Sequence, residues 1–186
     1  MRSAVILLFL LAGRSGATQA LRERDAEIRA ALPPSGQVLS ESGRHRFEAI
    51  VARIVDTRQM LESALGPRWA KLTPKERQRL LEAFEHRFRV SGGSQIDTMR
   101  EAHIEYLNES QQGELVVVAT RLAVKEETSE VRYVMRETSA GWRIVDVVID
   151  EVSTVENYRA SFARIIGREG VEGLIRRLER SGDAKG

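Results

Sequence analysis

The sequence predicts an α+β fold in which a twisted antiparallel sheet of about four strands is covered by several helices, with an apolar cavity between sheet and helices. Apolar residues recur every three or four positions before residue 90 and after residue 153, which is the helical period. Between residues 104 and 149 the period becomes two and the turns are short, which favours an antiparallel meander. These strands carry apolar side chains on both faces, so both faces need an apolar cover.

The N-terminal segment has the pattern of a secretory signal peptide. Arg2 precedes an apolar run over residues 4–12, which is too short to span a bilayer because a helical span needs about 20 apolar residues. Small residues favour cleavage after Ala17 or Ala20. We therefore expect residues 1–20 to be removed, the alternative being a buried N-terminal helix or an uncleaved anchor.

One ordered domain is expected over residues 44–180. A chain of 186 residues normally forms one domain that can bury a core without metals or disulfides. Residues 21–43 are predicted to be a charged helix that ends at Pro33-Pro34, followed by a polar linker, and residues 181–186 a tail.

Two helical regions are predicted before the sheet. The apolar spacing from Phe47 to Val55 indicates a helical region that ends at Leu65-Gly66-Pro67, where glycine supplies the cap and proline prevents continuation. Thr73-Pro74-Lys75-Glu76 is a capping box with proline at the first helical position. We expect residues 91–94, Ser-Gly-Gly-Ser, to break or bend the helix that follows.

The central part of the chain predicts the strands. Val116 and Val118 should point to one face of the sheet, and Leu115 and Val117 to the other. The expected strands are Ile104–Leu107, Glu114–Lys125, Glu130–Glu137 and Trp142–Ile149.

Two C-terminal helices are expected to supply part of the cover of the sheet. Ser153 and Glu156 form a second capping box before an apolar stripe. Gly167 is predicted to end this helix, and residues 171–178 to form a last amphipathic one.

Composition excludes several kinds of function. The net charge is +2, and loss of the two arginines in the signal segment removes it, so nucleic-acid binding is not expected. The absence of cysteine excludes disulfides, thiolate nucleophiles and cysteine metal sites.

No catalytic constellation is recognisable, and we expect no enzyme activity, metal site or cofactor. The three histidines, His45, His86 and His103, fall in no metal-protease pattern. Asp146 and Asp150 could be a carboxylate pair on one strand face, but surface charge satisfied by nearby arginines is the favoured interpretation.

Several segments over roughly residues 45–180 resemble a known family. The order and spacing of these segments are similar to those of the MlaC or toluene-tolerance family of periplasmic phospholipid-binding proteins, auxiliary components of a lipid-transporting ABC system. The segments are Thr73-Pro74, Val118-Ala119-Thr120-Arg121, Gly141-Trp142-Arg143-Ile144-Val145-Asp146-Val147, Asn157-Tyr158-Arg159 and Gly173-Leu174-Ile175.

The resemblance implies a periplasmic carrier that shuttles a phospholipid between an outer-membrane lipoprotein complex and an inner-membrane ABC transporter complex, and so maintains lipid asymmetry. The phospholipid would be cargo rather than a cofactor. A two-chain lipid in water exposes roughly 30 methylenes at about 0.8 kcal/mol each, a cost of about 25 kcal/mol. A carrier must therefore offer a dry cavity, and the head group can remain at its mouth.

Ten residues on elements flanking the sheet are expected to line this cavity. Arg121, Arg143 and Arg159 could meet a phosphate at the mouth, although surface ion pairs are favoured. The expected wall residues are Leu72, Phe84, Phe88, Ile104, Val116, Val118, Tyr133, Val147, Ile149 and Ile166.

Three alternatives remain open. A hopanoid-associated group shares the Gly-Trp-Arg-Ile-Val-Asp strand, so another hydrophobic ligand is possible. A non-lipid periplasmic adaptor of a membrane transporter would expose a large apolar patch rather than enclose a cavity. A small hydrolase with a cystatin-like α+β fold would depend on His86 or His103.

Overall fold

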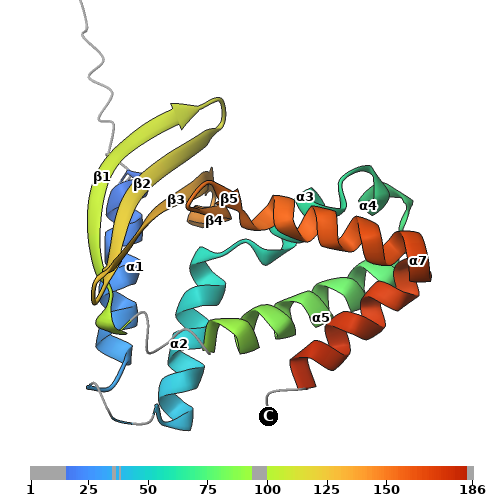
Figure 1. The fold of residues 1–186 in the computed structure, drawn as a ribbon, viewed down its shortest axis with the longest axis horizontal. Helices are drawn as coiled ribbons and strands as arrows, with labels where there is room; N and C mark the ends of the chain where they lie inside the picture. The colour runs from blue at the N-terminus through green and yellow to red at the C-terminus, as the bar shows by residue number, and fades with distance from the viewer. Residues whose placement is uncertain (1–15, 35–36, 38, 94–99, 184–186) are drawn as a thin grey trace, which may run out of the picture.

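The computed structural model describes residues 16–34, 37, 39–93 and 100–183. It confirms the α+β class: an antiparallel sheet lies beside two helices at one end of the molecule, and the other helices form a group beyond β4 and β5 (Figure 1). Most of the expected signal peptide lies outside the described residues, so its removal stays a prediction.

The sheet has five strands in the order β1-β2-β3-β4-β5, with every neighbouring pair antiparallel. The expected number was about four, and the additional strand is a two-residue one that pairs with the end of β4. The first strand is also longer than predicted, because its polar second half pairs with β2 through the backbone at the edge of the sheet. The strands are β1 (His103–Gln112), β2 (Leu115–Val124), β3 (Glu127–Thr138), β4 (Gly141–Ile149) and β5 (Val152–Ser153).

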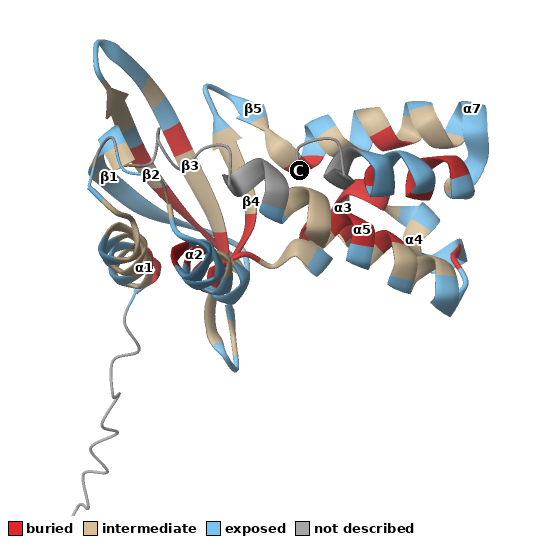
Figure 2. Ribbon diagram, turned by 90° about the horizontal axis from the view of Figure 1, so that it is seen from below, coloured by how far each residue is buried: buried red, intermediate tan, exposed pale blue. Residues whose placement is uncertain are grey.

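Helices α1 (Ala17–Ala31) and α2 (Glu41–Ile54) run side by side along one side of the sheet (Figure 2). The side chains of Ala17 and Leu21 are buried in the hydrophobic core. The first helix therefore packs with the predicted domain rather than standing apart from it. Both expected cleavage positions fall near its start.

The single helical region expected from Phe47 to Leu65 is two helices, α2 and α3 (Thr57–Leu65). Val55 forms a parallel bridge with Ile144 of β4, and the Asp56 backbone N–H donates to the Ile144 carbonyl at 2.8 Å. The Asp56 carboxylate then caps α3 by accepting from the Gln59 N–H at 2.9 Å. A long-range pairing thus interrupts a continuous helical pattern.

The predicted turn and capping box before the long helix are confirmed. Gly66 has φ of 55° between α3 and α4 (Pro67–Lys71), a conformation that glycine adopts without steric cost. The Thr73 N–H donates to the Glu76 carboxylate at 2.8 Å, and the Glu76 N–H donates to the Thr73 hydroxyl at 3.2 Å. This box starts α5 (Pro74–Gly93), which continues into the segment 91–94 where a break was expected.

The C-terminal helices form one kinked element, α7 (Thr154–Asp183), which starts at the predicted Ser153 capping box. The kink is at Gly170, with φ of 69° and ψ of −178°, and not at Gly167, which is helical. This element packs chiefly on α5 and α3, and its principal contacts with the sheet are with β4 and β5. The C-terminal helices therefore supply part of the cover of the sheet, as expected, and α1 and α2 also pack on it.

Candidate functional site

One face of the sheet lies against α1 and is here called the α1 face. The Thr18 N–H and hydroxyl of α1 donate to Glu109 of β1 at 2.8 and 2.6 Å, and Glu109 pairs with Val118 of β2. Since side chains two apart on a strand share a face, the register of the strands identifies the other residues of the α1 face. Its buried members are Val116, Val118, Thr120, Val131, Met135 and Ile144.

Six of the ten expected wall residues lie on the α1 face. Val118, Tyr133 and Val147 form one row across three strands. Ile149 lies beside Val131 near the edge, where 47% of its surface is exposed. The six are Ile104, Val116, Val118, Tyr133, Val147 and Ile149.

The other four expected wall residues lie in the part of the molecule formed by α3, α4, α5 and α7, which we call the helical group. Leu72 and Phe84 are buried, whereas Phe88 and Ile166 are partly buried against the same core. The core is continuous from the α1 face to α5 and α7. It brings together eight of the ten, all except Ile104 and Ile149. A contact of any of them with a ligand stays a prediction.

An aromatic cluster fills the part of this core between α5 and α7. The Phe84 ring centroid lies 5.1 Å from that of Tyr158, 6.2 Å from that of Phe162 and 6.3 Å from that of Phe88. The first two contacts are edge-to-face, the arrangement that the ring quadrupoles favour. Tyr158 and Phe162 were not among the expected wall residues, although their helical spacing puts them on one side of α7.

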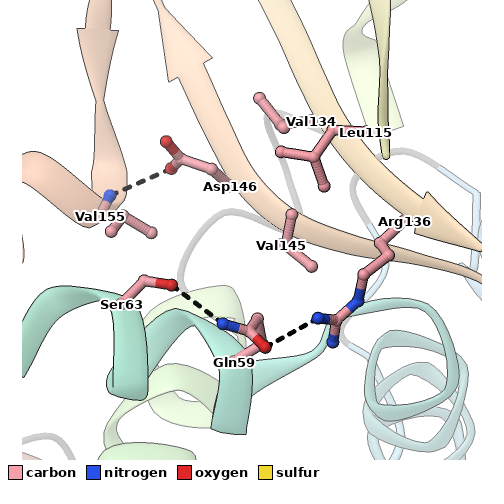
Figure 3. A pocket seen from close by; sticks show the side chains of 8 residues that line it. All are labelled: Gln59, Ser63, Leu115, Val134, Arg136, Val145, Asp146 and Val155. Carbon is pink, nitrogen blue, oxygen red and sulfur yellow. Dashed lines mark hydrogen bonds between the residues drawn. The ribbon is translucent and has the colours of Figure 1, made fainter. Parts of the chain in front are cut away.

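A cavity of about 230 Å³ lies on the opposite face of the sheet, next to α3 (Figure 3). Arg136 Nη1 donates to Gln59 Oε1 at 2.9 Å, and Gln59 Nε2 donates to Ser63 Oγ at 3.1 Å. None of the expected wall residues lines it, because the sequence does not reveal that α3 packs against this face. Its lining residues are Gln59, Ser63, Leu115, Val134, Arg136, Val145, Asp146 and Val155.

A second cavity, of about 330 Å³, lies among α3, α4 and α5. The Arg77 guanidinium lies 5.5 Å from the centre of the Trp69 ring and donates to the Trp69 carbonyl at 3.2 Å. Pockets for drug-sized molecules measure about 300–1,000 Å³, and both cavities lie below or at the bottom of that range, too small for the larger two-chain lipid. The space between the α1 face and the helical group is filled by the side chains of the core.

Two tyrosines on the α1 face lie in an unusual environment. Burial raises the pKa of Tyr133 to about 12, with smaller contributions from Tyr106 and Asp25. Burial also raises the pKa of Tyr106, and the charge of Asp25 adds to that effect. The Arg22 guanidinium of α1 lies 4.0 Å from the centre of the Tyr106 ring. Tyr106 was not among the expected residues, although the strand period places it on the same face as Ile104.

The three arginines considered for phosphate binding have protein partners. Arg121 pairs with Glu105 at 2.8 Å, as the ion-pair interpretation expected. Arg159 pairs with Glu156 at 2.6 Å. Arg143 donates to the Val55 carbonyl at 2.9 Å near the end of α2, so it satisfies a helix C-terminus.

Asp146 and Asp150 serve the backbone. Asp146 accepts from Ser153 Oγ at 2.5 Å and from the N–H groups of Val147 and Val155 at 2.8 and 3.0 Å. Asp150 accepts from the Glu130 N–H at 2.9 Å. The partners are thus backbone amides and a serine rather than the arginines expected, because Asp146 lies at the register shift of β4 close to the start of α7, and Asp150 lies beside Glu130 of β3.

The described residues offer no metal-binding group and no membrane-spanning helix. No cluster of three or more His, Asp or Glu side chains within residues 16–34, 37, 39–93 and 100–183 could hold a metal ion. Within the same ranges, no helix is both long enough and apolar enough to cross a bilayer.

Comparison with known proteins gives a consistent result. A family model described as "MlaC protein" matches residues 36–180. The phospholipid-binding protein from Ralstonia solanacearum, solved in complex with a phospholipid, superposes with a TM-score of 0.80 at 19% sequence identity, covering 91% of this chain and 98% of that one. At this identity the match shows a common fold. A search of the curated proteins gives no match.

Proposed function

The chain belongs to the MlaC protein family, and we propose that it binds a phospholipid between the α1 face of the sheet and the helical group and carries it through an aqueous compartment. The observation that carries this proposal is the continuous apolar core that joins the α1 face to α5 and α7. The phospholipid complex of the Ralstonia solanacearum protein, which has the same fold, supports the choice of ligand.

Lipid entry requires the sheet and the helical group to separate. The core side chains now fill the space between them, and the two cavities of about 230 and 330 Å³ lie elsewhere. Acyl chains can replace apolar contacts between the layers at little cost, because both are equally apolar. The helical group contacts the sheet mainly through β4 and β5, so this edge is our choice for the hinge.

We place the protein in the periplasm, between an outer-membrane lipoprotein complex and an inner-membrane ABC transporter complex. The family membership and the signal-peptide pattern of residues 1–20 support this location. A carrier without covalent chemistry fits the site, because the candidate carboxylates Asp146 and Asp150 are occupied by backbone amides.

The alternative of a non-lipid adaptor has less support. Within the described ranges, the large apolar side chains that are exposed are Leu107, Ile149 and Val152. Only Ile149 and Val152 are neighbours, as a cross-strand pair. An adaptor needs a broader patch, since apolar patches that bind partners cover several hundred Å².

The test is native mass spectrometry of the full chain, exported to a periplasm and purified without detergent. We expect a discrete adduct whose released lipid is a phospholipid. A hopanoid or other apolar adduct would change the ligand class, and a lipid-free mass that persists after incubation with liposomes would contradict the proposal.

Two valines of β4 supply matched variants. Val147 and Val148 are both partly buried, but Val147 pairs with Tyr133 on the α1 face, whereas Val148 pairs with Arg132 on the opposite face. A tryptophan at 147 would occupy the proposed lipid site. We therefore expect Val147→Trp to abolish the adduct and Val148→Trp to retain it, and equal retention would exclude the α1 face as the site.

A further inference from the structure

Two phenol hydroxyls interrupt the apolar surface of the α1 face. Tyr106 of β1 pairs with Thr120, and Tyr133 of β3 pairs with Val118, so the two rings lie on the same face on either side of β2. Thr120 and Val118 are successive same-face residues of β2, so the register makes the two tyrosines neighbours on this face, and the charge of Tyr106 contributes to the raised pKa of Tyr133.

The Tyr106 hydroxyl is buried and makes no hydrogen bond with any residue that the structure describes. Such groups are rare, since most buried polar atoms have a partner. The ring itself is held in place by Arg22, whose guanidinium lies 4.0 Å from its centre. A fixed ring with a free donor is typical of a group that is preorganised for a ligand.

Thr120 and Asp25 do not accept a hydrogen bond from the Tyr106 hydroxyl, and both are held by other hydrogen bonds. The Thr120 hydroxyl donates to the Val131 carbonyl at 2.9 Å. The Asp25 carboxylate accepts from Arg29 Nε at 3.0 and 3.1 Å. A bound ligand could supply the acceptor that the Tyr106 hydroxyl lacks among the described residues.

The chemistry of the face favours an uncharged acceptor. Asp25 raises the pKa of both tyrosines, whereas Arg22 and Arg29 lower that of Tyr106, so the offsetting charges around the phenols give a phosphate little net attraction. Both phenols are protonated at neutral pH and act as donors. The acyl ester carbonyls of a phospholipid are uncharged acceptors, and they lie at the junction between the chains and the head group.

We propose that the hydroxyls of Tyr106 and Tyr133 form a polar subsite that donates hydrogen bonds to an acyl ester carbonyl of the bound lipid. This inference rests on the proposed function. It places the glycerol backbone under α1, with the acyl chains extending over Val118 and Val147 toward the helical group. The subsite would make the protein select diacyl lipids over dialkyl ether lipids that have the same chains and head group.

The experiment compares diacyl phosphatidylglycerol with its dialkyl ether analogue as ligands of the full chain. A net hydrogen bond of roughly 1 kcal/mol corresponds to about fivefold in affinity, so we expect the wild type to bind the diacyl lipid about fivefold more tightly. Tyr106→Phe should bind both lipids equally, and Tyr133→Phe should reduce the preference. Tyr158→Phe is the matched control, because Tyr158 packs on Phe84 in the helical group; it should keep the preference.

Thermal unfolding of the lipid-free variants separates ligand binding from a structural role. Since the Tyr106 hydroxyl has no partner among the described residues, Tyr106→Phe should not lower the Tm of the lipid-free chain. Equal binding of the two lipids by the wild type would overturn the subsite and leave the proposed function standing. Failure of the wild type to bind either lipid would overturn both.

Discussion

Removing the Asp146 carboxylate should destabilise the protein severely, because this side chain joins β4 to α7. It accepts hydrogen bonds from Ser153 Oγ at 2.5 Å, the Val147 N–H at 2.8 Å and the Val155 N–H at 3.0 Å. Asp146→Ala leaves two backbone donors without an acceptor at roughly 1 kcal/mol each, and weakens the start of α7 by about 1 kcal/mol more. The expected loss in the free energy of unfolding is about 3 kcal/mol.

Urea denaturation followed by circular dichroism measures this loss. With an m-value of about 2 kcal/mol/M, the midpoint should fall by about 1.5 M. Asp146→Asn and Asp150→Asn form a matched pair: the first loses the charge at a site with three donors, and the second at an exposed turn with one. We expect losses of about 1 kcal/mol and under about 0.5 kcal/mol. If Asp146→Ala unfolds at the same urea concentration as Asp150→Asn, the structural role assigned to Asp146 is wrong.

Three further predictions concern the core, the tyrosines and the kink. Phe84→Ala should lower the free energy of unfolding by about 3–5 kcal/mol in urea denaturation, because a fully buried ring is lost. Phe88 is only partly buried, so Phe88→Ala should lower it less. Equal losses would contradict the central place of Phe84 in the core. The raised pKa of Tyr133, about 12, means that the folded state retains the proton longer than the unfolded state. The free energy of unfolding should therefore be unaffected by this group below pH about 10 and fall by roughly 2–3 kcal/mol as the pH rises to about 12. The control is Tyr133→Phe, which should lack this fall. If the wild type and Tyr133→Phe lose the same stability over this pH range, the phenol of Tyr133 is not buried. Gly170→Ala should lower the free energy of unfolding by about 1–3 kcal/mol, and so lower the Tm, since alanine is strained at φ of 69°. Gly167→Ala, at a helical position with open space, should raise the Tm slightly. If instead Gly167→Ala lowers the Tm and Gly170→Ala does not, the kink is at Gly167.

Local sequence patterns determined much of the secondary structure. The capping boxes at Thr73 and Ser153 predicted where α5 and α7 begin, and the left-handed Gly66 predicted where α3 ends. These signals depend on atoms three or four residues apart, so a sequence contains all the information they need. The alternation within β2 likewise predicted that Val116 and Val118 share a face. In β4 a register shift puts Ile144 on the same face as Val147, against strict alternation, and the pairing of the strands decides that six expected wall residues share one face.

Contacts between distant segments decided the rest. The helical pattern between α2 and α3 is interrupted by the pairing of Val55 with Ile144, a residue distant in sequence. Nothing in the α1 sequence reveals that Arg22 lies over Tyr106.

The sequence by itself therefore determined the α+β class, the starts of α5 and α7 and the family resemblance, because each depends on local periodicity, on capping or on the order of segments. The tertiary structure decided which helices cover the α1 face, that Gly170 rather than Gly167 forms the kink, and that the Tyr106 hydroxyl is buried with no partner among the residues that the structure describes. Burial and left-handed backbone at a given residue are set by what packs around it, and the packing partners of these residues are distant in sequence.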